Sequence, residues 1–300
     1  MKVFLKLVVR APLLFICHYI YRVMHTTSSL RGVWFEAMGA GGYCVSTVGP
    51  VRYLISTSDK VVSKSVYKTG EYDSNKLNQL TEKFEILKSK RILVDVGANI
   101  GTIALSALSS DLFDHVVAIE PNPLNFKLLS INVLLNDFGE RVRLKNVAVG
   151  AYENEQLIME LSPENFGDHR VRVIDQQGKD SELQRSVIKV PSTTLDELLS
   201  VEDTSSLLVW MDTQGYEANV LSGAIGLISS NVPFVIEFWP YGLRRADSFE
   251  LLKSNMQNFS WFVDLSDPDL CPIPMSEIEI NKLADSVGWK GRYTDIFLFN

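Results

Sequence analysis

From residue 91 onward, short apolar runs alternate with stretches of helical periodicity, and this alternation constrains the fold more than any other feature of the chain. Strands that alternate with helices are typical of βαβ units in a parallel sheet. Strands are expected at Arg91–Val96, His115–Ile119, Val142–Val149, Leu207–Met211, Phe234–Phe238, Trp261–Leu265 and Asp295–Phe299, and helices at Ile100–Leu108, Pro123–Leu135, Glu217–Ser229 and Ser248–Asn258.

The last two strands have no helix-only connection between them, so a final antiparallel pair is expected. The prediction is therefore an α/β, Rossmann-like fold with a seven-stranded, mostly parallel sheet and an antiparallel final strand. Residues 155–193 break the alternation and are expected to form a β-rich insertion with runs at Gln156–Leu161, Arg170–Ile174 and Val187–Val190.

The first ninety residues follow a different pattern. Residues 1–23 are expected to form an amphipathic helix with Lys2, Lys6 and Arg10 on one face. Short strands are expected at 51–56 and 60–66 and a helix at 74–89. We therefore divide the chain into an N-terminal helical and small β/α extension, 1–89, and a core domain, 90–300.

A glycine loop follows the first core strand: Asp95-Val96-Gly97-Ala98-Asn99-Ile100-Gly101. Gly97 is expected to allow a tight turn and a close ligand, and Gly101 to let the next helix pack on the strand. Asp95 at the strand tip suits the amino group of a ligand. Glu120, at the end of the next strand, suits both hydroxyls of a ribose. The loop therefore predicts S-adenosylmethionine as the ligand.

A nicotinamide dinucleotide is the competing ligand. Its Gly-x-Gly-x-x-Gly fingerprint needs glycine where this chain has Asn99, whose side chain would crowd a pyrophosphate. Asp95 is also poorly placed beside that anion. Both residues thus disfavour a dinucleotide, and a nicotinamide-dependent oxidoreductase is kept only as the alternative function.

Several ordered blocks resemble the FkbM family of class I methyltransferases. They are ILVDVGANIGTIALSAL, VVAIEPNPLNFKLLSINVLLN, VRLKNVAVG, NFGDHRV, VPSTTLDELL, LLVWMDTQGYEANVLSGA and FVIEF, with the closing TDIFLF. The resemblance implies a class I methyltransferase sheet and methyl transfer from S-adenosylmethionine to a hydroxyl of a carbohydrate, glycolipid or secondary metabolite. It implies that the cofactor is bound by Asp95, Gly97, Ala98, Asn99, Gly101, Glu120, Pro121, Asn122 and Ala148.

One block departs from the family pattern. The family usually has Lys-x-Asp-x-Glu-Gly at the fourth strand, where this chain has Trp210-Met211-Asp212-Thr213-Gln214-Gly215. Trp210 replaces the lysine and Gln214 the glutamate, whereas Asp212 and the later Glu217 remain. These departures leave a third hypothesis open, a scaffold that binds the cofactor without catalysis.

Methyl transfer to oxygen requires alignment of the acceptor, exclusion of water and removal of the hydroxyl proton. We expect Asp212, Glu237 and His169 to serve the acceptor as catalytic residues. Each has a structural alternative: a helix N-cap for Asp212, an ion pair with Arg244 for Glu237, and a solvated loop position for His169. Burial of Glu237 would raise its pKa and suit it to act as a base.

Other polar and aromatic side chains enter as weaker candidates. A divalent metal held by Asp212 and Glu237 is less favoured than metal-free base catalysis, so no metal ligand is predicted. Asp264 and Asp267 are more distant metal candidates. Trp239 and Tyr241 are expected either to form an aromatic platform for the acceptor or to pack in the core.

Composition limits the partners. The chain has 36 Asp and Glu against 29 Lys and Arg, which argues against a nucleic-acid backbone as the main partner. The three cysteines have neither disulfide nor metal spacing, which fits a reducing, cytoplasmic compartment. We therefore expect a small-molecule or glycan acceptor. Residues 1–23 leave open a contact with the inner membrane surface and a homodimer.

Overall fold

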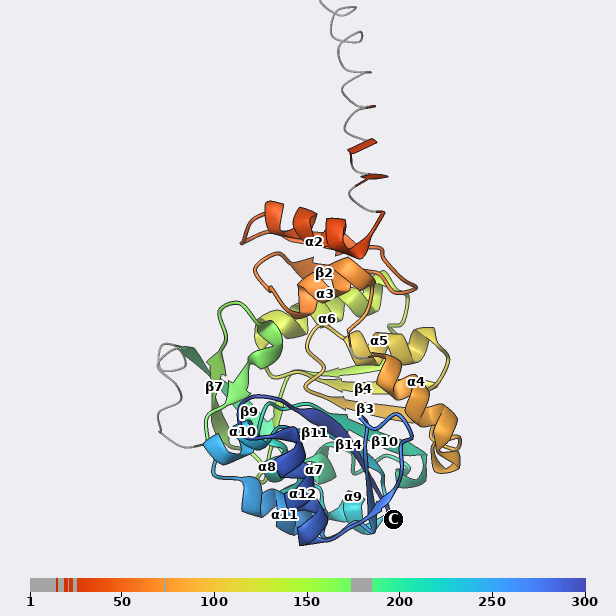
Figure 1. Cartoon of the computed structure of the whole chain (residues 1–300), viewed down its shortest axis with the longest axis vertical. Coiled ribbons are helices and arrows are strands. Elements are labelled where there is room, and N and C mark those ends of the chain that lie inside the picture. Colours follow the sequence, from red (N-terminus) through yellow and green to blue (C-terminus); the bar gives the residue numbers. More distant parts are fainter. Residues whose placement is uncertain (1–14, 16–18, 21, 24–25, 73, 174–184) are drawn as a thin grey trace, which may run out of the picture.

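The computed structural model describes residues 15, 19–20, 22–23, 26–72, 74–173 and 185–300. Its main sheet has eight strands in the order β13-β12-β14-β11-β10-β3-β4-β5. Figure 1 labels the central strands β14, β11, β10, β3 and β4. Neighbours from β11 to β5 are parallel, whereas β14 is antiparallel to both β11 and β12. The strands are β3 (Ile92–Val96), β4 (His115–Ile119), β5 (Val142–Lys145), β10 (Leu207–Met211), β11 (Phe234–Phe238), β12 (Trp261–Asp264), β13 (Ile273–Pro274) and β14 (Thr294–Phe299).

This sheet confirms the predicted α/β fold with its antiparallel final strand. Seven strands were expected, and the eighth is the two-residue edge strand β13. It lies in the connection from β12 to β14, ahead of helix α12 (Glu277–Val287), which explains why no helix-only connection is visible in the sequence.

Alternate residues of the central strands bury two separate faces, because successive side chains in a strand point to opposite sides. On one face Val94, Val209 and Met211 pack with the helices α8 (Glu217–Ser222), α9 (Ile225–Ser229), α11 (Phe249–Met256) and α12. On the other, Leu93 and Leu208 pack with α4 (Ser74–Lys83), α5 (Thr102–Ser109) and α6 (Pro123–Leu135).

The predicted helix Glu217–Ser229 is wrong as a single element, since it breaks between α8 and α9. A Cβ on Gly223 would overlap the Gly150 carbonyl, so the chain passes too closely there for a continuous helix face. The carboxylate of Asp196, in the first turn of α7 (Leu195–Leu198), then accepts from Gly226 N and Leu227 N and caps α9.

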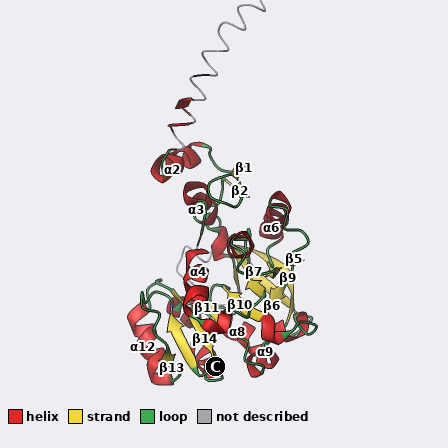
Figure 2. Cartoon of the chain, turned by 90° about the vertical axis from the view of Figure 1, so that its right-hand side faces the viewer, coloured by secondary structure: helices red, strands yellow, loops and turns green. Residues whose placement is uncertain are grey.

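The N-terminal extension shares the core of the main sheet. Phe35, Tyr53 and Leu80 belong to the same buried cluster as Leu93. Figure 2 shows α2, α3, β1 and β2 at one end of the molecule. The expected boundary at 89/90 therefore falls between secondary-structure elements, but one hydrophobic core continues across it. The elements of the extension before α4 are α2 (Ser28–Ala37), β1 (Tyr43–Ser46), β2 (Tyr53–Ser56) and α3 (Val62–Thr69).

Within the extension, the strand predicted at 60–66 is wrong, because this segment is the helix α3. Its buried residues Val62, Ser63, Val66 and Tyr67 follow helical spacing, which overrides the β preference of valine. The strand at 51–56 is present as β2. The predicted helix 74–89 ends as α4 at Lys83, and a short 3-10 turn, η1 (Glu85–Leu87), follows.

Three strands of the insertion and the preceding β6 form a second sheet in the order β6-β9-β7-β8. The strand predicted at Val142–Val149 is wrong as one element: it divides into β5 in the main sheet and β6 in this sheet. Asn146 lies at the division and donates to the Glu120 carbonyl at 2.8 Å. The strands are β6 (Ala148–Val149), β7 (Gln156–Leu161), β8 (Arg170–Val171) and β9 (Ser186–Thr193), and residues 174–184 lie outside the described residues.

Most of the predicted N-terminal helix, with Lys2, Lys6 and Arg10, lies outside the described residues. The described side chains of that segment are exposed: Phe15 by 72%, Tyr19 by 62% and Ile20 by 46%. Among the helices that the structure describes, none combines the length and the apolar character needed to cross a bilayer.

Candidate functional site

A cavity of about 320 Å³ opens at the carboxyl ends of β3, β4, β10 and β11. The chain continues from β3 to β4 on one side and reaches β10 on the other, so the cavity lies at the topological switch point of the sheet. Val62 and Tyr72 of the extension and residues 165–171 of the insertion complete its walls. Residues from the extension, the core sheet and the insertion thus meet around one cavity.

The glycine loop lines the β3 side of this cavity. Gly97 has φ +85°, and a Cβ there would lie 2.0 Å from the Asp212 carbonyl oxygen. The main reason for glycine at position 97 is therefore the close approach of the ends of β3 and β10. Gly101 has φ +92° and begins α5, and its missing Cβ makes room for Leu129 of α6. Gly101 was expected to let α5 pack on the strand, but the close contact at this position is with helix α6.

Asp95 is 2% exposed and lines the cavity. Its Oδ2 accepts from Ala104 N at 3.1 Å, so the carboxylate also holds the first turn of α5. Burial raises the pKa of Asp95 to about 7.

Glu120 is 4% exposed and lines the cavity at the tip of β4. Its Oε1 accepts from Asn122 N at 2.7 Å and its Oε2 from Asn99 N at 2.8 Å. Burial raises the pKa of Glu120 to about 7, against the opposing effect of these backbone donors. Each carboxylate oxygen keeps a second lone pair for a ligand.

The remaining cofactor candidates divide into two groups. Ala98, Asn99, Pro121 and Ala148 line the cavity with the two acids. Asn122 is instead the N-cap of α6, because its Oδ1 accepts from Leu124 N and Asn125 N.

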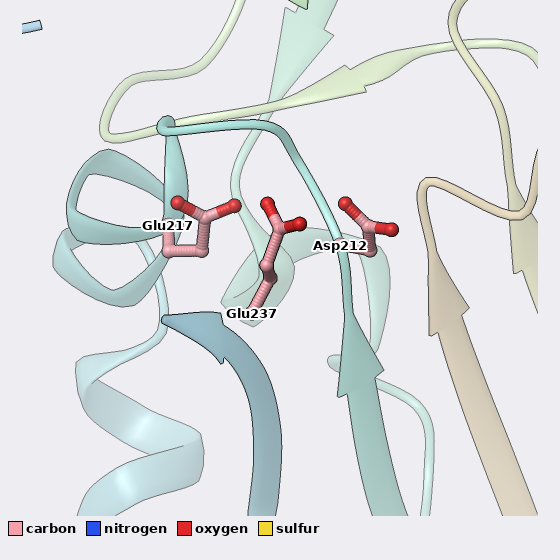
Figure 3. Close-up of side chains that lie close together, drawn as sticks. All are labelled: Asp212, Glu217 and Glu237. Carbon is pink, nitrogen blue, oxygen red and sulfur yellow. The ribbon is translucent and has the colours of Figure 1, made fainter. Parts of the chain in front are cut away.

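Three carboxylates converge on the β10–β11 side. Oxygens of Asp212, Glu217 and Glu237 lie within 4.8 Å of one another (Figure 3). Oε1 of Glu217 accepts from Thr213 N and Gly215 N, so this fully buried acid shapes the turn after β10. Asp212 and Glu237 line the cavity itself.

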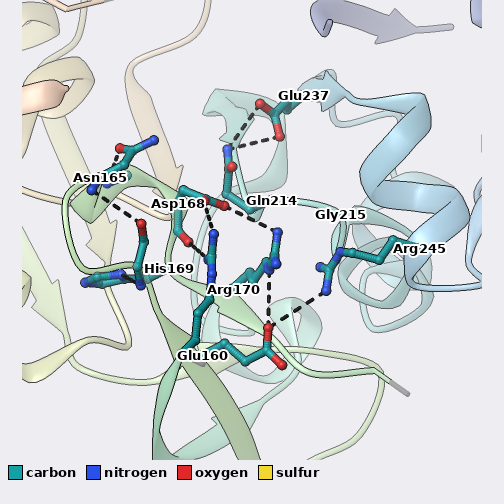
Figure 4. Close-up of polar contacts among 12 residues, drawn as sticks. Glu160, Asn165, Asp168, His169, Arg170, Gln214, Gly215, Glu237 and Arg245 are labelled. Carbon is teal, nitrogen blue, oxygen red and sulfur yellow. Dashed lines mark hydrogen bonds and ion pairs between the residues drawn. The ribbon is translucent and has the colours of Figure 1, made fainter. Parts of the chain in front are cut away.

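Gln214 joins two of these carboxylates. Its Nε2 donates to Asp212 Oδ1 at 2.7 Å. The same Nε2 donates to both oxygens of Glu237 at 3.1 Å (Figure 4). Its backbone has φ +57°, a conformation that non-glycine residues adopt rarely. The amide therefore lies where a cation shared by the two acids would lie.

Glu237 is 3% exposed, and its side chain faces these acids. Arg244, its ion-pair partner in the structural alternative, instead stacks on Trp289. Burial and the charges of Asp212, Glu217 and Asp295 raise the pKa of Glu237 well above its ordinary value. Asp295 lies beside it on β14 and pairs with Lys76 of α4 at 2.6 Å.

His169 lines the cavity from the insertion. Its Nδ1 accepts from Ser162 N at 3.0 Å, so in the neutral ring the proton is on Nε2. Burial lowers the pKa of His169 to about 4. The neutral ring of this cavity-lining residue therefore carries its hydrogen-bond donor on Nε2, and its catalytic role stays a prediction.

The residues around His169 form a buried ionic cluster (Figure 4). Asp168 pairs with Arg185 and with Arg170 at 3.6 Å. Arg170 is 1% exposed, and its Nε lies 3.3 Å from Glu160. The cluster fixes the cavity wall that carries His169.

Among the weaker candidates, Trp239 lines the cavity, and its buried Nε1 has no hydrogen-bond partner. Tyr241 contacts the Trp239 ring at 5.4 Å but does not line the cavity. Asp264 accepts from Thr294 Oγ1, and Asp267 accepts from Asp269 N. Both acids serve turns beside β12 and β14.

Sequence reasoning missed several cavity residues. Asn125 follows the predicted N-cap by one helical turn, a position that could have singled it out. Val62 and Tyr72 carry no such signal, because the extension reaches the site only through tertiary packing. The lining residues that the sequence did not single out include Val62, Tyr72, Asn125, Phe166 and Asp295.

Comparison with known proteins gives one family. Residues 95–256, a little over half of the chain, match the family model of the methyltransferase FkbM domain. No curated protein is significantly similar in sequence.

Similarity to solved structures is low. The methyltransferase FkbM of Methylobacillus flagellatus KT is 15% identical with a TM-score of 0.42, over 79% of this chain and 52% of that chain, about half its length. A putative transferase from Pyrococcus horikoshii is 13% identical with a TM-score of 0.42, over 91% and 84%. TYW2 from P. horikoshii, solved in complex with MeSAdo, is 14% identical with a TM-score of 0.41, over 91% and 83%.

Proposed function

This chain belongs to the FkbM methyltransferase family, and from that premise we propose that it is an S-adenosylmethionine-dependent O-methyltransferase. The proposed acceptor is a hydroxyl of a carbohydrate, glycolipid or secondary metabolite. One observation carries the proposal: the Asp95 and Glu120 pair and the Asp212, Gln214 and Glu237 cluster line the same cavity.

The β3–β4 side of the cavity suits the cofactor. Glu120 has lone pairs left to accept from two ribose hydroxyls, and Asp95 offers a carboxylate toward an amino group. Pro121 and Ala148 provide apolar surface beside them for an adenine. When bound, S-adenosylmethionine supplies a methyl group on a positively charged sulfur.

The β10–β11 side suits a hydroxyl acceptor. Burial and the neighbouring acids raise the pKa of Glu237, which makes its carboxylate a stronger base toward the hydroxyl proton of the acceptor, and Asp212 lines the cavity beside it. Gln214 fixes the separation of the two carboxylates through its amide hydrogens. No step in this scheme requires a metal.

Two donors complete the acceptor site. Both belong to residues that line the cavity: His169 carries a proton on Nε2, and the Nε1–H of Trp239 is buried without a partner. Donors, carboxylate acceptors and an aromatic ring together are the groups that recognise a polyhydroxylated molecule. This combination supports a carbohydrate-like acceptor over a nucleic acid.

The N-terminal segment supports a further partner, an anionic membrane surface. All 36 acidic residues of the chain occur from Glu36 onward, whereas five of its 29 Lys and Arg precede that residue. Basic residues interspersed with apolar ones are typical of segments that lie on anionic lipid. Sedimentation with phosphatidylglycerol vesicles, against phosphatidylcholine vesicles and a variant lacking residues 1–25, tests this partner.

Calorimetric titration with S-adenosylhomocysteine tests the cofactor. We expect binding by the wild type and loss of binding in Glu120→Gln, which keeps the size of the side chain. Absence of wild-type binding, or preference for a reduced nicotinamide, would reject the proposal.

Turnover is tested with methyl-labelled S-adenosylmethionine and fractionated glycan, glycolipid and metabolite pools. The labelled product should be an alkali-stable methyl ether. Its formation should be lost in Glu237→Gln, which removes the proposed base. Cofactor binding with no labelled product from any pool would favour the non-catalytic scaffold.

A further inference from the structure

A row of three carboxylates crosses the ends of β10, β11 and β14. Asp295 is the direct partner of Glu237 in the register between β14 and β11. On the other side, oxygens of Asp212 and Glu237 lie within 4.8 Å of each other. All three residues line the cavity. Glu237, the proposed base, therefore lies between two other acids.

Helix α4 of the N-terminal extension covers the same face of the sheet. Val235 and Phe297 belong to one buried cluster with Leu80 of α4. Glu237 and Asp295 lie two residues away from them on the same strands, and residues two apart in a strand point to the same side. The side chains of both acids therefore point toward the side of the sheet on which α4 lies.

Lys76 of α4 reaches this row of acids. Its Nζ lies 2.6 Å from Asp295 Oδ2, and the two side chains are 29% and 9% exposed. The same ammonium lies 5.7 Å from the ring centroid of Tyr293, which lines the cavity. A partly buried pair of this kind is screened less by salt than a surface pair. The extension thus brings a positive charge to one carboxylate of the cavity.

The charges around Glu237 decide whether it is free to take a proton. Asp212 from β10, Glu217 from α8 and Asp295 from β14 all oppose its ionised form, and burial acts in the same direction. The Gln214 amide favours the ionised form through its hydrogen bonds but carries no charge. A carboxyl that stays protonated cannot accept the hydroxyl proton of an acceptor. Offsetting one of the opposing charges therefore favours the basic form of Glu237.

Resting on the proposed function, we propose that Lys76 is a positioning residue of the acceptor site, which holds Asp295 and offsets its negative charge beside Glu237. Lys76 itself does not line the cavity, so it acts through Asp295 and not by contact with the acceptor. The N-terminal extension thereby contributes to the chemistry of the site as well as to its wall.

The titration of Glu237 tests this role without an acceptor. The carboxyl carbon-13 resonance of Glu237 is assigned by its absence from Glu237→Gln and is followed against pH. Lys76→Gln keeps a hydrogen-bond donor toward Asp295 and removes only the charge. We expect the titration midpoint of Glu237 to move upward by about one pH unit, the effect of one lost nearby charge. Lys76→Arg keeps the charge and should titrate as the wild type does.

Asp295→Asn gives the opposite prediction and keeps the test valid if Lys76→Gln does not fold. This substitution removes the negative charge beside Glu237 and leaves Lys76 charged. The titration midpoint of Glu237 should therefore move downward.

Lys64→Met is the matched control. Lys64 of α3 pairs with Glu36 of α2 within the same extension, and neither residue lines the cavity. Loss of this ion pair should leave the titration midpoint of Glu237 at its wild-type value.

The role of Lys76 would be overturned by an unchanged or lower midpoint of Glu237 in a folded Lys76→Gln, or by an unchanged midpoint in Asp295→Asn. Equal upward shifts in Lys64→Met and Lys76→Gln would also overturn it, because they would indicate a general structural effect. These results would leave the proposed function intact, since the titration requires no turnover. A wild type that binds no S-adenosylhomocysteine would instead reject the proposed function, on which this role rests, whatever the titration shows.

Discussion

Replacing Gly97 by alanine should separate the tips of β3 and β10. A Cβ at this position would lie 2.0 Å from the Asp212 carbonyl oxygen, well inside van der Waals contact. The backbone φ of +85° adds a second penalty for any side chain. To relieve the overlap, the segment at Asp212 must move away from β3 and weaken the Asp212 N to Val96 O hydrogen bond of 3.0 Å.

The two penalties can be separated by a matched variant. Gly41 has φ +88°, but a Cβ there meets nothing within 4 Å. Gly41→Ala should therefore cost only the left-handed conformation, about 1–2 kcal/mol. Gly97→Ala should add about 1–3 kcal/mol of overpacking to a similar backbone cost.

Urea unfolding measures the loss of stability in each variant as a change in the midpoint concentration, provided that the slope m of unfolding free energy against urea concentration is unchanged. Calorimetric titration with S-adenosylhomocysteine should show weaker binding by Gly97→Ala alone, since only that substitution displaces cavity residues. Equal destabilisation by the two substitutions would refute the view that Gly97 is required by the approach of Asp212.

Three further predictions concern titration. Affinity for S-adenosylhomocysteine should increase as pH rises through about 7, because a ribose donates to the ionised form of Glu120. Burial raises the pKa of this carboxyl to about 7. Calorimetric titration across this pH range checks the prediction, and an affinity that does not change with pH would contradict it. Ionisation of Glu237 should destabilise the fold progressively as pH rises from the ordinary carboxyl pKa through its raised one, because burial and the neighbouring acids oppose its charge. Glu237→Gln should therefore match the wild type in urea midpoint near pH 4 and exceed it near pH 8, and no difference at the higher pH would count against this origin of the shift. The ring of His169 should be neutral with its proton on Nε2 at pH 6 and should titrate at about 4, since burial disfavours its charged form; nitrogen chemical shifts report this directly, and an imidazolium at pH 6 would exclude the assigned tautomer.

Local signals in the sequence predict the elements that carry the cofactor loop. Asn122 and Pro123 mark the start of α6, and the helix runs over the expected residues Pro123–Leu135. The strands at His115–Ile119, Leu207–Met211 and Phe234–Phe238 are also as predicted. Because strand tips of a parallel sheet meet at one edge, the shared location of Asp95, Glu120, Asp212 and Glu237 follows from order alone.

What escaped prediction depends on tertiary contacts. The helix at Val62–Thr69 looks like a strand in isolation, since its valines prefer extended backbone until one face packs on the core. The protonated nitrogen of His169 is set by Ser162 N, seven residues away. Gln214 stood out only as a departure from a family pattern, and its link between Asp212 and Glu237 required the fold.

The ion pair between Lys76 and Asp295 joins positions 219 residues apart at the rim of the cavity. Closing a loop of this length adds an entropic cost that pairing of the neighbouring strands β3 and β4 does not carry. We therefore expect the part of the cavity wall that contains Asp295 to form after β3 and β4 have paired. Recovery of ligand binding during refolding should lag behind recovery of secondary structure, which makes the ligand a kinetic reporter of the last stage of assembly.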